Sequence, residues 1–135
     1  MTCLFCAIAR GEEPADLVLE NEDVVAFLDV RPVFKGHVLV VPREHHVTLP
    51  ELPERLLVPL LTAVQRVGAA VLEVLDAHGS FMAVNNTVSQ SVPHVHVHVV
   101  PRRRKDGLRG FFWPRTRYEP GEAAAYADRL RSALG

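Results

Sequence analysis

The stretch that decides the fold is His94-Val95-His96-Val97-His98-Val99-Val100, in which histidine and valine alternate before a final apolar pair. Successive side chains of a β-strand point to opposite faces of the sheet, so the alternation predicts three imidazoles on one face and valines on the other. Burying three polar rings together costs free energy unless each ring finds a partner. The sequence therefore predicts a strand over 92–100 with core packing on one face and a chemical site on the other.

Three interpretations of this stretch remain open on the residues alone. It could be the exposed polar face of an edge strand, or it could supply three ligands to a catalytic zinc ion. It could also carry a histidine that acts on a phosphate. Amide and hydroxyl groups lie just upstream, at Asn85, Gln90 and Ser91, and such groups orient imidazoles or hold phosphate oxygens rather than bind zinc. The context favours the phosphate site.

The segments around the histidines predict the rest of an α+β domain. Apolar runs at 17–20, 24–30, 37–41 and 81–84 predict four further strands, with turns at 21–23 and 35–36. Apolar residues at helical spacing over 57–76 predict one long helix that begins near Pro59, because proline is tolerated in a first turn. A short helix or turn at 4–10 and a helix at 119–134 complete the chain. We expect a five-stranded antiparallel sheet with the long helix packed on it and a C-terminal helix.

Length and composition limit the class of protein. With 135 residues, 48% of them hydrophobic, the chain suits one domain over 1–135. The net charge of −1 argues against a protein that coats nucleic acid, and neither a membrane-length apolar run nor a secretory leader is visible, so we expect a cytoplasmic protein. A basic segment within 102–117 is either a solvated loop or an anion site; its basic residues are Arg102, Arg103, Arg104, Lys105, Arg109, Arg115 and Arg117.

Four ordered motifs make the chain resemble the HIT (histidine triad) family. Residues 94–100 match the family's His-φ-His-φ-His-φ-φ signature, where φ is apolar. The other motifs are Cys3-Leu4-Phe5-Cys6-Ala7-Ile8, Phe27-Leu28-Asp29-Val30-Arg31-Pro32 and Gly36-His37-Val38-Leu39-Val40-Val41-Pro42. The resemblance is strongest over 3–102 and weaker over 103–135, which holds a basic and aromatic loop and the C-terminal helix.

The resemblance implies a hydrolase or nucleotidyl transferase that cleaves at the α-phosphorus of a purine nucleoside 5′-phosphate derivative. Phosphoramidates are the first expectation and dinucleoside polyphosphates the alternative. His96 is the implied nucleophile, which would form a nucleotidyl-histidine that water resolves. The other implied catalytic residues are His98, Ser91, Gln90 and Asn85. The implied nucleotide-binding residues are Asp29 for the ribose hydroxyls, His37, and the apolar Leu4, Phe5, Ile8, Phe27 and Val30. Ordinary core positions are the alternative for Leu4, Ile8 and Val30, and the resemblance also implies a homodimer.

The cysteine pair Cys3-x-x-Cys6 could by itself be a redox pair or two incidental buried thiols. The HIT resemblance implies instead a structural zinc held by Cys3, Cys6, His45 and His94. Such a closed Cys2His2 set leaves no position for a reacting water. His46 is the alternative to His45.

Two segments depart from the family pattern. Residues 86–89, Asn-Thr-Val-Ser, contain no glycine where the family carries a glycine-rich loop, which weakens the inference about the leaving group. The aromatic and basic segment 110–118 is expected to close over the site, to join a dimer interface, or to pack on its own core. A non-catalytic nucleotide-binding module and a three-histidine metalloenzyme therefore remain alternative functions.

Overall fold

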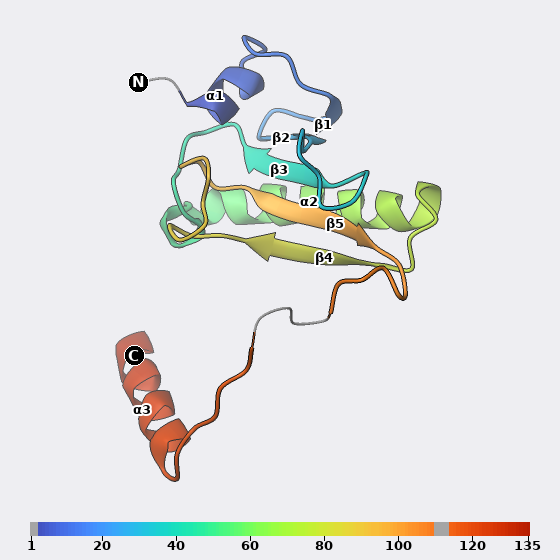
Figure 1. The fold of residues 1–135 in the computed structure, drawn as a ribbon. Helices are drawn as coiled ribbons and strands as arrows, with labels where there is room; N and C mark the ends of the chain where they lie inside the picture. The colour runs from blue at the N-terminus through green and yellow to red at the C-terminus, as the bar shows by residue number, and fades with distance from the viewer. Residues whose placement is uncertain (1–2, 110–113) are drawn as a thin grey trace.

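Five antiparallel strands form one sheet in the order β1-β2-β3-β5-β4 in this computed structural model, which describes residues 3–109 and 114–135 (Figure 1). The strands are β1 Leu17–Glu20, β2 Val24–Leu28, β3 Val38–Pro42, β4 Gly79–Val84 and β5 Val97–Arg102. The helices are α1 Leu4–Ala9, the 3-10 turn Leu49–Glu51, α2 Glu54–Val74 and α3 Glu122–Leu134. The expected α+β class and the five-stranded antiparallel sheet are confirmed.

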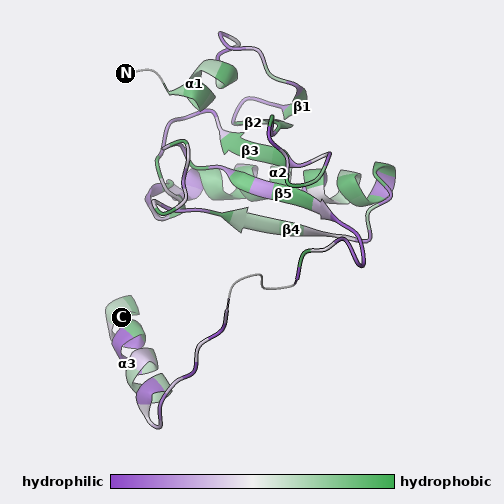
Figure 2. Ribbon diagram, viewed as in Figure 1, coloured by the Kyte–Doolittle hydropathy of each residue, from purple (hydrophilic) through white to green (hydrophobic). Residues whose placement is uncertain are grey.

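Helix α2 covers one face of the sheet and builds the larger core (Figure 1). Its buried side chains, such as Leu60, Val64 and Val67, recur at helical spacing and pack against the strands. By length and composition alone α2 could cross a membrane, but its buried stripe packs on the sheet, and in Figure 2 its mostly green, hydrophobic ribbon lies behind the strands. It is the core helix of this domain.

Helix α1 covers part of the opposite face and builds a second, smaller core. Alternate residues of β2 divide between the two cores, with Ala26 under α2 and Phe27 under α1. Because both faces are covered, β2 and β3 are nearly continuous apolar runs rather than alternating ones. The central strands are therefore a rigid support for side chains on the α1 face.

Strand β5 begins at Val97, so the expectation of a strand from residue 92 is wrong. The ladder stops here because β4 ends at Val84 and β3 ends at Pro42, which has no N–H to donate. Upstream of Val97 the backbone instead forms isolated hydrogen bonds. In one of them the Val95 N–H donates to the His46 carbonyl at 2.8 Å. The alternation of side chains nevertheless continues, since Val95, Val97 and Val99 all lie in the α2 core.

Helix boundaries also differ from the expectations. Helix α2 begins at Glu54, one turn and more before Pro59, which lies inside the helix. Helix α3 begins at Glu122 because Gly121 adopts a left-handed conformation at the N-cap. The other strands shift from their expected bounds by no more than two residues.

Helix α3 has no buried residue and is drawn away from the sheet in Figure 1. Its apolar side chains Tyr126, Leu130 and Leu134 follow one another at four-residue spacing and are 45%, 64% and 88% exposed. In the described part of the aromatic and basic segment, residues 114–118 are also exposed, so the expectation that they pack on the chain's own core is wrong. The Gly110–Trp113 part of the aromatic segment lies outside the described residues.

Candidate active site and metal centre

The three histidines of the alternating stretch lie on the α1 face of the sheet. The ring centroids of His96 and His98 are 5.0 Å apart, and Phe5 of α1 stands edge-on to His96 at 5.0 Å. His94 and His96 are buried, at 0% and 3% exposure, while His98 is half-buried. Because the valines between them sit in the α2 core, each imidazole is anchored by packing on the other side of the sheet.

The hydrogen bond of His96 assigns its tautomer. Its Nδ1 lies 2.8 Å from the carbonyl oxygen of His94, which can only accept, so Nδ1 carries the proton. In the neutral ring, Nε2 is then unprotonated and keeps its lone pair. This is the protonation state that a nucleophilic imidazole needs.

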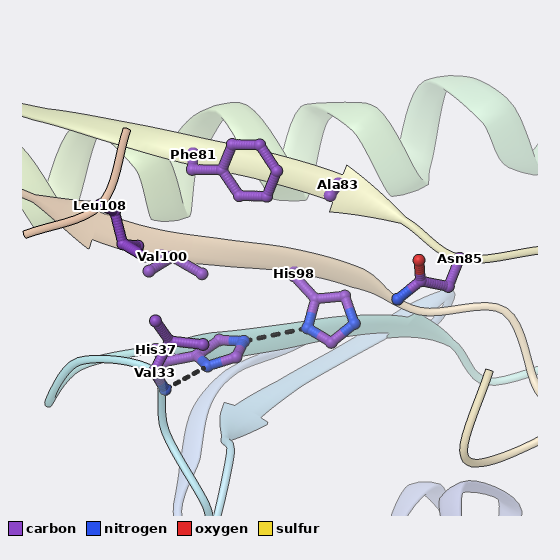
Figure 3. A pocket seen from close by; sticks show the side chains of 8 residues that line it. All are labelled: Val33, His37, Phe81, Ala83, Asn85, His98, Val100 and Leu108. Carbon is purple, nitrogen blue, oxygen red and sulfur yellow. Dashed lines mark hydrogen bonds between the residues drawn. The ribbon is translucent and has the colours of Figure 1, made fainter. Parts of the chain in front are cut away.

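A chain of hydrogen bonds runs from the backbone of Val33 through His37 to His98 (Figure 3). The N–H of Val33 donates to His37 Nδ1 at 3.1 Å, so His37 carries its proton on Nε2 and donates it to His98 Nδ1 at 3.0 Å. His98 must therefore hold its proton on Nε2. That atom is buried and has no partner among the described residues, so it is a donor available to a bound ligand.

Asp29, His37 and His98 also lie close enough together to be considered as metal ligands. The hydrogen bonds argue against that role, because neutral His37 has no lone pair at Nε2 once Val33 donates to Nδ1. The Asp29 carboxylate lies 3.7 Å from His37 Nε2, and a second carboxylate oxygen accepts from Arg31 N–H. This cluster fits an orienting network better than a cation site.

A second cluster joins Cys3, Cys6, His45 and His94, whose ligand atoms lie within 4.8 Å of one another. His94 donates Nε2–H to the Pro42 carbonyl at 2.8 Å, which leaves Nδ1 free and pointing at the two sulfur atoms at 3.4 Å. Burial lowers the pKa of His94 to about 4, so its imidazole is neutral and able to ligate. The donor set, two thiols and two imidazole nitrogens, fits a tetrahedral metal ion.

The sequence profile of the HIT domain matches residues 10–105, which is most of the chain. The chain belongs to the HIT family. Over 138 aligned residues the HIT chain is 32% identical to an adenosine 5′-monophosphoramidase of Schizosaccharomyces pombe, and the alignment covers 99% of each protein.

Two solved HIT structures extend the likeness to the fold, and one of them contains zinc. A HIT-family protein of Bacillus subtilis superposes with a TM-score of 0.89 at 33% identity, covering 100% of this chain and 99% of that one. A zinc-bound histidine triad protein of Mycobacterium smegmatis superposes with a TM-score of 0.76 at 37% identity and covers 98% of both chains. The cluster of this HIT chain and that relative's zinc together point to a metal site.

The three histidines of the triad do not share one metal ion. Among the residues that the structure describes, His94 clusters with the cysteines, whereas His98 clusters with His37 and Asp29. His45, not its neighbour His46, reaches the cysteines, with Nδ1 at 3.3 Å from Cys6 Sγ. His46 instead contacts Glu44 at 2.6 Å. The geometry thus separates a candidate metal centre around His94 from a candidate chemical centre around His96.

The expected nucleotide-binding residues of the HIT chain divide into buried and exposed groups. Phe5 and Ile8 of α1 and Phe27 of β2 lie in the smaller core between α1 and the sheet. Leu4 and Val30 are 47% and 90% exposed and can contact a ligand directly. Asp29 directly follows β2, with its side chain 21% exposed and a carboxylate oxygen 3.7 Å from His37 Nε2.

The loop between β4 and the histidines adopts left-handed conformations without glycine. Thr87 and Ser89 have φ values of 70° and 64°. Gln90 braces this loop, since its Oε1 accepts from Thr87 N–H at 2.8 Å and its Nε2 donates to the Val47 carbonyl at 2.5 Å. Both ends of the Gln90 amide are therefore engaged, one within the loop and one with the Val47 carbonyl. This bracing role could not be predicted from the sequence, because the bond to Val47 joins residues 43 positions apart.

Asn85 and Ser91 lie in different hollows of the surface. Asn85 lines a pocket next to His98, whereas Ser91 is exposed in a groove beside Cys3 and His45. In the basic segment, Arg102 is bonded to Asp106 at 2.6 Å, and Arg103 pairs with Asp76 at 3.3 Å. These two arginines stabilise the loop after β5.

The half-buried His98 makes the stability of the domain depend on pH. Burial and the nearby His96 lower the pKa of His98 from about 6.5 to about 4. Above about pH 6.5 His98 is neutral in both the folded and the unfolded chain. As the pH falls from 6.5 towards 4, the unfolded chain takes up the proton first, so the folded state loses stability. We expect the free energy of unfolding to fall between pH 7 and 5, and His98→Gln to reduce that fall by about 1 kcal/mol, allowing for partial exposure.

Urea denaturation of both proteins at the two pH values measures this effect. His78→Gln is the control, because His78 lies at the far end of the sheet beside β4 and pairs with the Arg104 backbone. An equal pH dependence in His98→Gln and wild type would show that His98 is not protonated on unfolding in this range.

Proposed function

We propose that the protein hydrolyses purine nucleoside 5′-phosphoramidates by way of a nucleotidyl-histidine on His96. The observation that carries the proposal is the bond from His96 Nδ1–H to the His94 carbonyl, which leaves Nε2 unprotonated in a buried ring. The similarity to an adenosine 5′-monophosphoramidase over almost the full length of both chains supports the same reaction class.

In the first step, the lone pair of His96 Nε2 attacks the α-phosphorus and the P–N bond of the substrate breaks. The electron pair of that bond stays on the leaving nitrogen, which takes a proton from water and departs as an amine. The nucleotidyl group is now on Nε2, while Nδ1–H still donates to the His94 carbonyl and stabilises the charge on the ring.

In the second step, a water oxygen attacks the same phosphorus and the P–Nε2 bond breaks. The electron pair returns to Nε2, the water proton is released, and a nucleoside monophosphate leaves. His98 Nε2–H is the buried donor that would bond a phosphate oxygen in both steps, and His37 fixes this tautomer. The net reaction consumes one water and yields an amine and a nucleoside monophosphate.

Asp29 is proposed to bind the ribose. Its carboxylate can accept hydrogen bonds from two neighbouring hydroxyl groups, and it follows β2 with one oxygen 3.7 Å from His37 Nε2. The exposed side chains of Leu4 and Val30 would contact the base, over the buried rings of Phe5 and Phe27.

The metal ion held by Cys3, Cys6, His45 and His94 is proposed to be zinc, with a structural role. Four protein ligands would leave no open position, so the ion would fasten α1 to the segment before β5 without activating water. Metal-binding thiols are typical of a reducing compartment, which is consistent with a cytoplasmic protein.

A second copy of the chain is the proposed partner of α3. A 13-residue helix with no buried residue is only marginally stable on its own. Its exposed apolar stripe of Tyr126, Leu130 and Leu134 would be stabilised by contact with another protein surface. The similarity to the Bacillus subtilis protein includes this helix, because the superposition covers the whole chain. We therefore expect a homodimer with α3 in the contact.

Acid-free quenching during turnover tests the proposed intermediate. Wild-type protein mixed with adenosine 5′-phosphoramidate and denatured within milliseconds should gain the mass of one adenylyl group, located on the peptide that contains His96. The adduct should be stable to base and labile to acid, as a phosphorus–nitrogen bond requires. Turnover without any adduct would exclude the two-step reaction, and nucleotide binding without turnover would indicate the non-catalytic module.

A further inference from the structure

A groove of about 410 Å³ lies on the α2 side of the sheet, between the last turns of α2 and strands β1 to β3. Val38 at the start of β3 and Val71 of α2 line it, and both belong to the core under α2. The triad histidines lie on the α1 face, so the sheet separates the groove from the candidate chemical centre. The proposed hydrolysis makes no use of it.

Large apolar side chains are left partly exposed along this groove. Val18 of β1 is 47% exposed, Leu28 at the end of β2 is 37% exposed, and Val74 in the last turn of α2 is 71% exposed. A contiguous apolar surface of this kind is unfavourable in water and marks a place where a ligand or partner binds.

The groove follows the axis of α2. Val67, Val71 and Val74 line it and lie on one face of the helix, because they are three or four residues apart. Between residues 67 and 75 the chain rises by about 12 Å. Apart from Lys35, the lining holds no aromatic ring and no side chain that forms hydrogen bonds. A ligand with polar groups along its length would lose their hydration without replacement, whereas an aliphatic chain has none to lose.

Lys35 supplies the only charge among the residues that line the groove. It lies in the turn between β2 and β3, and in the part of the chain that the structure describes it makes no hydrogen bond or ion pair. Lys35 and Leu75 also line a neighbouring hollow that contains Arg103. The groove therefore has an apolar length and one basic end.

The negative charges around this basic end are already paired. The last turn of a helix carries partial negative charge, but Arg103 donates to the Leu75 carbonyl at 3.2 Å and pairs with Asp76 at 3.3 Å. Asp106, which lines the neighbouring hollow, is bonded to Arg102 at 2.6 Å. The net charge at this end of the groove is positive.

From this lining we infer that the groove binds a linear aliphatic carboxylate, a free medium-chain fatty acid, with its chain along α2 and its carboxylate at Lys35. The chain contacts branched aliphatic side chains over its length, and the carboxylate meets an ammonium group that no other described residue occupies. The inference does not depend on the proposed function, because the groove and His96 lie on opposite faces of the sheet.

Calorimetric titration with octanoate and decanoate, below the concentrations at which they form micelles, tests the apolar part of the site. One site per chain should saturate, and decanoate should bind about tenfold more tightly than octanoate, since each covered methylene contributes roughly threefold. Ala70→Leu places a larger side chain in the groove and should weaken decanoate binding by about tenfold. Ala69→Leu is the matched control, because Ala69 is the adjacent exposed alanine of α2 and does not line the groove.

A lysine substitution tests the charged end. Lys35→Gln should weaken decanoate binding by about threefold at low salt, as expected for an exposed ion pair, and should leave the binding of uncharged decanol unchanged. Lys105→Gln is the control, because Lys105 is the only other lysine of the chain and does not line the groove.

Four results would overturn the inference. Octanoate and decanoate could bind equally well, or Ala70→Leu and Ala69→Leu could have the same effect. Lys35→Gln could weaken decanol as much as decanoate, which would mean that the carboxylate is not recognised. Finally, sedimentation could show that Ala70→Leu, but not Ala69→Leu, dissociates a dimer, in which case a second copy of the chain covers the groove.

Discussion

Replacing His96 by alanine is expected to lower turnover of adenosine 5′-phosphoramidate by roughly 1,000-fold or more, because the proposed covalent intermediate forms on this residue. His96 is the imidazole whose Nδ1–H donates to a backbone carbonyl, so alanine removes the proposed nucleophile. Binding of adenosine monophosphate should change by only a few-fold, since the ribose and base contacts remain. Steady-state amine release and calorimetry measure the two quantities.

His78→Gln is the control for this variant, because it also removes one histidine but at the far end of the sheet. It should turn over substrate like the wild type. A His96→Ala protein that retained more than about a tenth of the activity would show that the reaction does not pass through His96.

Loss of the metal ion is expected to lower stability while the chemistry of the remaining folded protein survives. A ligand bound at about 1,000 times its dissociation constant adds roughly 4 kcal/mol to the free energy of unfolding. For a domain of 135 residues this corresponds to a fall in Tm of roughly 10 °C or more when Cys6→Ser prevents binding. Calorimetry with and without a chelator measures the fall, and elemental analysis measures the metal content.

His46→Ala is the matched control, since His46 follows the proposed ligand His45 but contacts Glu44 instead of the cysteines. It should keep the metal and the wild-type Tm. Brief chelation that abolished turnover without lowering Tm would place the ion in the reaction rather than in the fold.

The fold could be predicted largely from hydrophobic periodicity. Period-two and helical patterns located the five strands and three α-helices of the described residues, with the largest errors, of about five residues, at the starts of β5 and α2. The predicted start of β5 was wrong because a strand ladder needs a partner strand with free N–H groups, and Pro42 at the end of β3 has none. This limit lies in the partner strand β3 and not in the 92–100 segment itself. The start of α2 was wrong because tertiary packing of Leu56 and Leu60 outweighs the cost of Pro59 in the helix.

The candidate site was predictable as a set of residue types but not as a network. The motifs brought together the two cysteines, His45 and His94, and the triad histidines. They could not show which nitrogen of each ring carries the proton, because that depends on the Val33 amide, on the Pro42 carbonyl and on the His94 carbonyl. Nor could they separate Asn85 from Ser91, which are close in sequence but line different hollows.

The alternation over 94–99 has a consequence for how this protein can change in evolution. The same few residues supply the core under α2 and the side chains of the chemical centre, one set on each face. A single inserted or deleted residue there would exchange the faces, putting valines in the site and imidazoles in the core. Substitutions can therefore change the side chains of residues 94–99, but the number of residues in this segment must stay the same. Loop 85–91 pairs with no strand, so changes in length are confined to it and to similar turns, where they can alter the ligand without unfolding the sheet.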